Sequence, residues 1–156
     1  MQPAAQRRFY VPESVHVART LLSELRNAHK KLIGQLMAMD ALTSAKAVDP
    51  TLCATGRWRL SQASLGRRLL AARICDYFLP RLEPDRRARV KAVADADRAL
   101  LRVSSTHLGH WPATAVHADW TGFCSASREM QRRTHAHIVL EQQVLYPMLE
   151  DAARRI

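Results

Sequence analysis

Four long segments of this chain repeat apolar residues at the spacing of an amphipathic α-helix, and this pattern constrains the fold more than any other feature. Prolines separate the segments. The segments cover residues 13–46, 51–79, 84–110 and 113–146, and Pro147 is expected to end the last helix. The chain has five glycines and no Asn-Gly or Asp-Gly hairpin signal. Long helices with short connections pack as bundles, so we predict an all-α fold, an antiparallel up-and-down four-helix bundle.

The expected domain organisation is a single bundle with a short tail at each end. At 156 residues with 47% hydrophobic residues, the chain is large enough for one closed core. We assign residues 1–12 to an N-terminal tail, 13–150 to the bundle and 151–156 to a C-terminal tail. The stretches "YFLPRLE" (77–83) and "VLYPMLE" (144–150) resemble each other at the ends of the second and fourth segments. This internal echo indicates two helical hairpins.

Charge and cysteine content bear on partners and location. The net charge is +10, but the arginines are scattered over every segment instead of being gathered in one arm. An acidic partner, another protein or a second copy in a homodimer are therefore favoured over nucleic acid. The three cysteines cannot all pair within the chain, and no apolar run is long enough for a signal peptide or a membrane span. We expect a cytoplasmic protein that does not enter a membrane.

Ionisable residues interrupt the apolar stripes of three predicted helices. His29 lies on the stripe of the first segment, Asp97 on that of the third, and His137 and Glu141 on that of the fourth. The second segment shows a stripe without a polar residue: Ala63, Leu70, Ile74 and Phe78. His135 points the other way and is expected to be solvated.

A buried carboxylate or imidazole is costly unless it is paired or bound to a metal. Four such groups on converging stripes are consistent with two arrangements. One is a hydrogen-bonded polar cluster. The other is a metal site with His29, His137, Glu141 and Asp97 as ligands, a nitrogen and oxygen set suited to one iron, manganese or zinc ion.

The fourth-segment motif "HIVLEQQVLYPMLE" resembles the hemerythrin-like, or HHE cation-binding, domains. These are bundles of two helical hairpins in which helices one and three carry a His, and helices two and four carry His-x-x-x-Glu followed by an aromatic or Leu and then Pro. His137, Glu141 and Pro147 match that motif, and "NAHKKLIGQL" matches the first helix through His29. The resemblance spans residues 15–150 and implies a cation-binding sensor or regulatory protein that is not an enzyme.

Two of the four family positions depart from that pattern. The second segment has Leu70 and Ile74 where the family has its His and Glu, and the third has Asp97, or Arg98 after a one-residue slip, in place of a His. A di-iron centre needs more carboxylates and histidines than remain, so we do not expect one. Either one metal ion is held, with Asp97 as a fourth ligand or orienting an imidazole, or Arg98 turns inward and pairs with Glu141 in a metal-free interior. In the second case the protein would act on a partner through its arginine-rich surface.

The other motifs in the sequence give little support for a functional site. His107, His110 and His117 are expected to lie in a surface loop, because no carboxylate or cysteine cluster accompanies them. The chain has no Gly-rich phosphate loop, Gly-x-Ser-x-Gly elbow or Cys-x-x-Cys. Enzymatic activity based on a nucleophile therefore has no support in the sequence.

Overall fold

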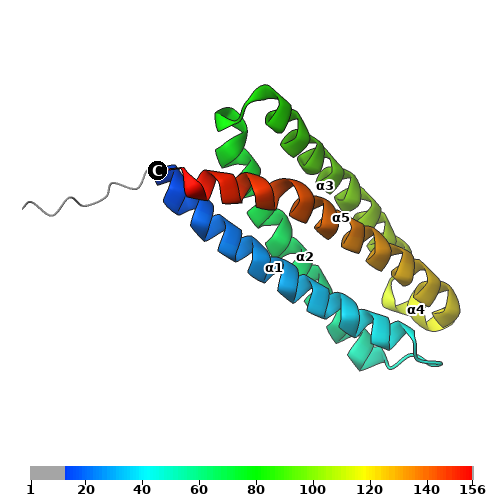
Figure 1. The fold of residues 1–156 in the computed structure, drawn as a ribbon. Coiled ribbons are helices and arrows are strands. Elements are labelled where there is room, and N and C mark those ends of the chain that lie inside the picture. Colours follow the sequence, from blue (N-terminus) through cyan, green and yellow to red (C-terminus); the bar gives the residue numbers. More distant parts are fainter. Residues whose placement is uncertain (1–12, 156) are drawn as a thin grey trace, which may run out of the picture.

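A computed structural model describes residues 13–155, and within that range the chain folds into helices joined by short connections, without a strand. The elements are α1 (Glu13–Thr43), α2 (Pro50–Phe78), the 3₁₀ turn η1 (Leu79–Arg81), α3 (Pro84–His110), α4 (Ala113–Ala118) and α5 (Trp120–Arg154). The predicted tail at residues 1–12 and Ile156 lie outside the described residues. Figure 1 shows the four long helices side by side, with the short α4 at the end far from the C-terminus.

Helix starts follow local chemistry. The Asp49 side chain accepts a hydrogen bond from the Leu52 amide at 3.1 Å, and Pro50 occupies the first turn. Asp119 does the same for α5 through the Gly122 amide at 2.9 Å. This second cap divides the predicted 113–146 helix into α4 and α5, so the single fourth helix expected from periodicity is wrong.

The end of α5 corrects two further predictions. The helix passes through Pro147 and continues to Arg154, so residues 151–154 belong to it and not to a tail. A proline inside a helix removes one hydrogen bond and crowds the preceding turn. Here Met148 and Leu149, both fully buried, gain enough apolar contact to keep the helix going.

The related stretch at Pro80 behaves differently. After the η1 turn Leu82 is extended, and Glu83 is held extended by the second proline, Pro84. The two echoing segments therefore end differently: one closes a helix and the other lies inside one.

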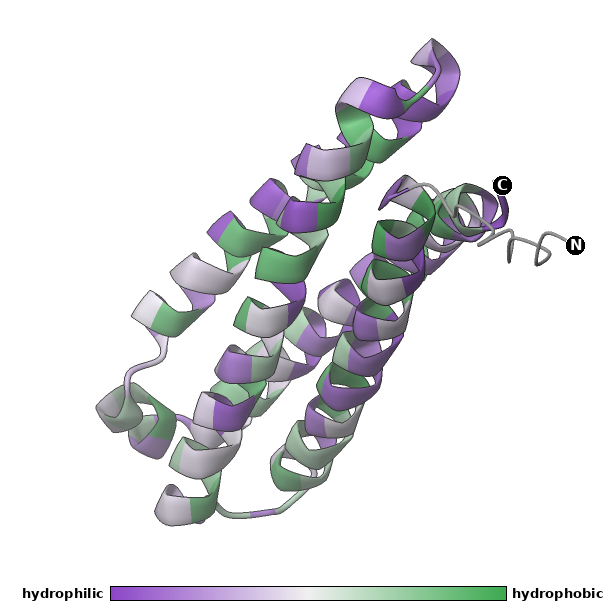
Figure 2. Cartoon of the chain, turned by 90° about the vertical axis from the view of Figure 1, so that its left-hand side faces the viewer, coloured by the Kyte–Doolittle hydropathy of each residue, from purple (hydrophilic) through white to green (hydrophobic). Residues whose placement is uncertain are grey.

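The helices pack unequally. α1 lies against α2 and α5 along its length, whereas α3 packs mainly on α5 and less on α2. Gly56 of α2 marks a close approach to α1, since a Cβ there would lie 2.7 Å from Leu42 Cδ1. In Figure 2 hydrophobic and hydrophilic residues alternate along each helix, as expected for helices with one buried and one exposed face.

Buried apolar residues form three clusters along the long axis. The largest, which includes Leu25, Ile74 and Leu145, lies toward the C-terminal end of α5; a small middle cluster is formed by Leu32, Leu36 and Ile138; the third, around Phe123, lies near α4. Polar residues lie between the first two clusters, at the depth of His29 and Glu141.

Two leucines on the same side of α3 as Val90 and Val93 are not buried. Leu101 and Leu108 are 38% and 46% exposed, and only Val90 and Val93 of α3 are buried. The C-terminal half of α3 therefore leaves part of its apolar stripe uncovered.

Candidate functional site: a buried polar cluster

Five charged or ionisable side chains from all four long helices meet inside the protein. We call this group the polar cluster: His29 of α1, Arg67 of α2, Asp97 of α3, and His137 and Glu141 of α5. Glu141 is fully buried, and only the Asp97 side chain keeps modest exposure. All four predicted ligand residues are thus brought together, and the prediction that His137 and Glu141 point inward is confirmed.

Arg67 is the member that the sequence analysis missed. Its Nη1 donates to Glu141 Oε1 at 3.1 Å and its Nη2 donates to Asp97 Oδ1 at 2.7 Å, so one guanidinium joins two carboxylates from different helices. Arg67 lies four residues after Ala63 and three before Leu70, on the very stripe that was expected to have no polar interruption. Its position on the apolar face was the signal that could have identified it.

The question of Asp97 or Arg98 is decided in favour of Asp97. Asp97 faces the polar cluster, while the Arg98 side chain is 65% exposed and pairs with Asp95 on the same helix at 3.4 Å. An arginine does pair with Glu141, but it comes from α2 and not from α3. Arg98 as the inward residue is therefore wrong.

His29 and Tyr146 extend the polar cluster along α1 and α5. His29 Nε2 lies 3.2 Å from Glu141 Oε1, and its Nδ1 lies 2.6 Å from the Tyr146 hydroxyl. A carboxylate only accepts, so Nε2–H donates to Glu141; in that tautomer Nδ1 accepts from the Tyr146 O–H. Burial raises the pKa of Tyr146, and the negative charge of Glu141 adds to this, while a hydrogen bond from Gln142 and the charge of Arg26 oppose it. The raised pKa keeps the hydroxyl protonated as a donor.

His137 is the least satisfied member. Its Nε2 lies 3.4 Å from Asp97 Oδ1 and 3.9 Å from Glu141 Oε1, yet it makes no hydrogen bond. Burial lowers the pKa of His137, and the charges of Arg67 and His29 act in the same direction. The negative charges of Glu141 and Asp97 oppose this lowering without reversing it. Its imidazole is therefore neutral at pH 7.

Two other buried atoms are also without a hydrogen-bond partner: Glu141 Oε2 and Arg67 Nε. Unpaired buried polar atoms are rare and costly in native proteins. In this cluster they leave one unused carboxylate oxygen and one unused imidazole nitrogen, which are atom types that bind cations.

As arranged, these residues do not fit a metal ion. Across residues 13–155, no three His, Cys, Asp or Glu side chains form a group that could hold one. The reason is that Glu141 Oε1 and Asp97 Oδ1 are already bound to the Arg67 guanidinium, which brings a positive charge to the centre of the predicted ligands. Arg67 and the two carboxylates carry one positive and two negative formal charges, so the guanidinium offsets half of the negative charge without a metal.

The three histidines expected in a loop are helical. His107 and His110 close α3 and His117 closes α4. The loop expectation is therefore wrong for all three. His110 and His117 are exposed, whereas His107 is half-buried and stacks on Phe123 with ring centroids 6.0 Å apart.

Comparison with known proteins gives no match: no family model, no curated protein and no solved structure is significantly similar to this chain. Among the helices between Glu13 and Arg154, none has the length and apolar character needed to cross a membrane.

Proposed function

We propose that this protein is a hemerythrin-like antiparallel four-helix bundle that works without a metal, as a regulatory or interaction protein. The observation that carries the proposal is the double ion pair of Arg67 with Glu141 and Asp97 inside the helices. A buried guanidinium that joins two carboxylates supplies the positive charge that a metal ion supplies in cation-binding bundles.

The proposed interior has a structural role. Arg67 connects α2 to α3 and α5, while His29 connects α1 to α5 through Glu141. Buried ion pairs contribute little net stability but can fix which helices pack together and in which register. The cluster would thus hold four helices in one arrangement while the surface makes the functional contacts.

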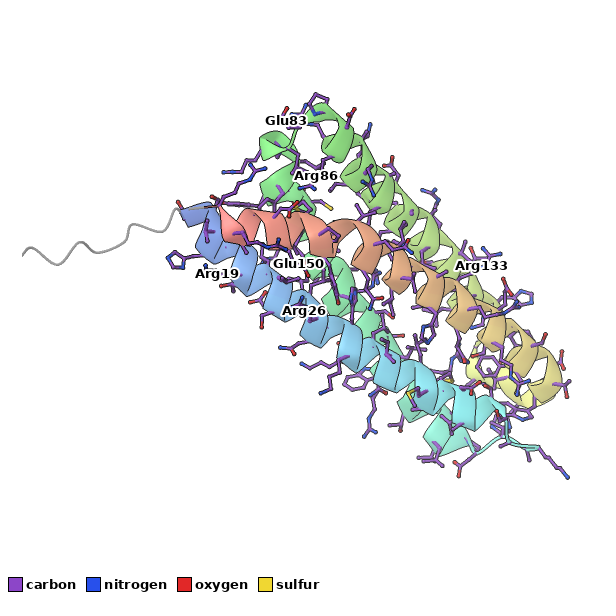
Figure 3. The ribbon with its side chains drawn as sticks, in the orientation of Figure 1. Arg19, Arg26, Glu83, Arg86, Arg133 and Glu150 are labelled. Carbon is purple, nitrogen blue, oxygen red and sulfur yellow. The ribbon has the colours of Figure 1, made fainter. Side chains whose placement is uncertain are left out.

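The surface supports a contact with an acidic partner. Arg19, Arg26 and Arg133 are exposed on α1 and α5 and are labelled in Figure 3. Arg26 pairs with Glu150 and Arg133 with Glu129, but such exposed pairs are weak and exchange readily with a partner's carboxylates. An interaction of this kind would weaken as salt is raised.

Elemental analysis tests the metal-free proposal. Protein purified without chelator, beside an Arg67→Met variant, is expected to contain no stoichiometric iron, manganese or zinc. Stoichiometric metal in the wild type that is lost on Glu141→Ala would overturn it.

The second candidate is the cation-binding function that the resemblance implies. The unpartnered His137 Nε2 and Glu141 Oε2 favour it, since they could bind a metal together with His29 if Arg67 moved aside. In that case one iron, manganese or zinc ion would be held and would supply a positive charge. Metal uptake by Arg67→Met but not by the wild type would support a site that the arginine has closed.

Heparin chromatography tests the surface proposal. Retention that falls steeply between about 0.05 and 0.2 M salt is expected for an arginine-rich contact surface. Elution without retention at the lowest salt would remove the acidic-partner proposal while leaving the interior one standing.

A further inference from the structure

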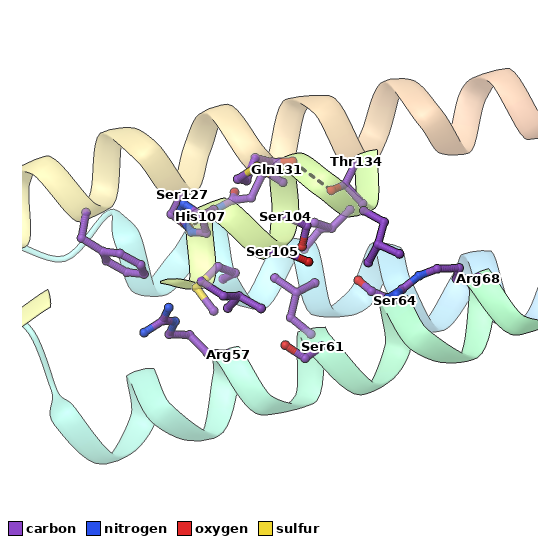
Figure 4. A pocket seen from close by; sticks show the side chains of 17 residues that line it. Arg57, Ser61, Ser64, Arg68, Ser104, Ser105, His107, Ser127, Gln131 and Thr134 are labelled. Carbon is purple, nitrogen blue, oxygen red and sulfur yellow. Dashed lines mark hydrogen bonds between the residues drawn. The ribbon is translucent and has the colours of Figure 1, made fainter. Parts of the chain in front are cut away.

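A cavity of about 290 Å³ lies beyond the polar cluster, between α2, α3 and α5 and next to α1. This volume is near the low end of the range for small-molecule sites in proteins. Figure 4 shows side chains of α2 and α3 facing each other across it, among them Ser64 and Arg68 on one side and Ser104 and Ser105 on the other.

One part of the cavity wall is apolar and incompletely covered. Leu101 and Leu108 of α3 line it and remain exposed although they belong to the apolar stripe of their helix. The buried Phe123 lines the cavity as well, together with Leu36, Met39, Leu60 and Met130. Side chains patterned for burial but left exposed around a cavity are suited to an apolar ligand.

The charged part of the wall is wholly positive. Arg57 and Arg68 line the cavity, no Asp or Glu does, and neither arginine forms an ion pair with any residue of the described range 13–155. The Arg57 guanidinium lies over the Phe123 ring, 5.1 Å from its centroid. Two arginines without counter-charges at one cavity favour an anion.

Uncharged polar groups complete the lining. Burial lowers the pKa of His107, and the charges of Arg57 and His110 add to this, so a neutral imidazole with a donor and an acceptor faces the cavity. Gln131 Nε2 donates a hydrogen bond to Ser127 Oγ at 3.1 Å, and both residues are buried. Further hydroxyls come from Ser61, Ser64, Ser104, Ser105 and Thr134.

We propose that this cavity binds a small carboxylate with an apolar body. The carboxylate pairs with Arg57, which lies over Phe123, and the apolar body covers Leu101, Leu108 and Phe123, with Arg68 at the other end of the cavity adding positive potential. The site shares no residue with the polar cluster, so the inference goes beyond the proposed function and does not depend on it.

Isothermal titration calorimetry of the whole chain with octanoate and 3-phenylpropionate tests the proposal. Both probes carry the same carboxylate, and their apolar bodies separate an aliphatic from an aromatic ligand. Saturable binding of at least one is expected, with octanol and octylamine at least about tenfold weaker, because a charge-assisted hydrogen bond contributes at least that factor. Absence of binding by both acids overturns the proposal, as does equal binding of octylamine.

Matched variants locate the site. Arg57→Gln is expected to weaken acid binding about tenfold, and Arg68→Gln to weaken it less, because Arg68 acts on the carboxylate only through its charge. Arg102→Gln removes the same charge from the exposed side of α3 and should leave binding unchanged. An equal loss in Arg102→Gln would mean that net charge alone attracts the probes, which contradicts a built site.

A cavity-filling change gives an independent measure. Ser64→Leu places a larger side chain of good helix propensity in the cavity. It should abolish binding while circular dichroism and the thermal midpoint show a folded protein. Unchanged affinity in a folded Ser64→Leu variant overturns the assignment of this cavity. All titrations contain EDTA, which removes free metal ions. Absence of acid binding is therefore distinguishable from failure of the metal proposals.

Discussion

Arg67 and Glu141 form an ion pair at 3.1 Å at a depth where Arg67 is 3% exposed and Glu141 is fully buried. The same guanidinium reaches Asp97, so one residue of α2 pairs with two carboxylates, one on α3 and one on α5. Its removal would leave two negative groups with no charged partner of opposite sign in the polar cluster.

The stability of the fold should therefore depend strongly on Arg67. Arg67→Ala is expected to lower the free energy of unfolding by about 3–5 kcal/mol, the usual result of breaking a buried ion pair from one side. Urea denaturation measures the change. Arg98→Ala is the matched control, since Arg98 is exposed and its pair with Asp95 contributes about 0–1 kcal/mol.

A double-mutant cycle separates the pair from the loss of packing. Glu141→Gln combined with Arg67→Met should cost less than the sum of the two single changes, because no buried charge of this pair is then left alone. Strictly additive effects would mean that the two side chains do not interact.

Tyr146→Phe should destabilise the protein by about 1 kcal/mol, since His29 Nδ1 loses its hydrogen bond with the Tyr146 hydroxyl. Tyr77→Phe serves as the control, because the Tyr77 ring packs on Phe78 while no hydrogen bond of its hydroxyl is found within residues 13–155. Equal losses in the two variants would contradict a stabilising hydrogen bond between His29 and Tyr146.

The pH dependence of stability should include a contribution from His107, whose pKa is lowered from 6.5 by burial first and then by Arg57 and His110. A histidine with a depressed pKa binds its proton more readily in the unfolded chain. Its contribution to stability is complete above pH 6.5 and is lost as the pH falls toward the folded-state pKa. Urea midpoints between pH 7.5 and 5 should therefore fall less steeply in His107→Gln than in wild type, whereas exposed His135→Gln should follow wild type.

Cys75 should react very slowly with iodoacetamide in the native protein. Burial raises the pKa of its thiol to about 11, and nearby carboxylates, Glu141 first, add to the effect. Thiolate is the reactive species, so little is present at pH 8. Site-resolved mass spectrometry should show Cys75 labelled rapidly only in denaturant; rapid native labelling would contradict its burial.

The boundaries of the helices are harder to predict from the sequence than the helices themselves. Apolar periodicity identified α1, α2 and α3 to within a few residues, because burial on one face imposes that spacing. Pro147 was expected to end a helix by local rules, but the buried Met148 and Leu149 outweigh the lost hydrogen bond. Tertiary contacts decided that boundary.

The sequence by itself determined that the chain is helical and that His29, His137 and Glu141 lie on inward faces, because both properties follow from the repeat of apolar residues along each helix. Only the tertiary structure decided that Asp97 and not Arg98 faces inward, and what these groups meet. A long arginine side chain can leave an apolar stripe for solvent or turn inward to a carboxylate, and the sequence contains both Arg67 and Arg98. Arg67 is the one turned inward, since the packing of α2 places its guanidinium within hydrogen-bonding distance of carboxylates from α3 and α5.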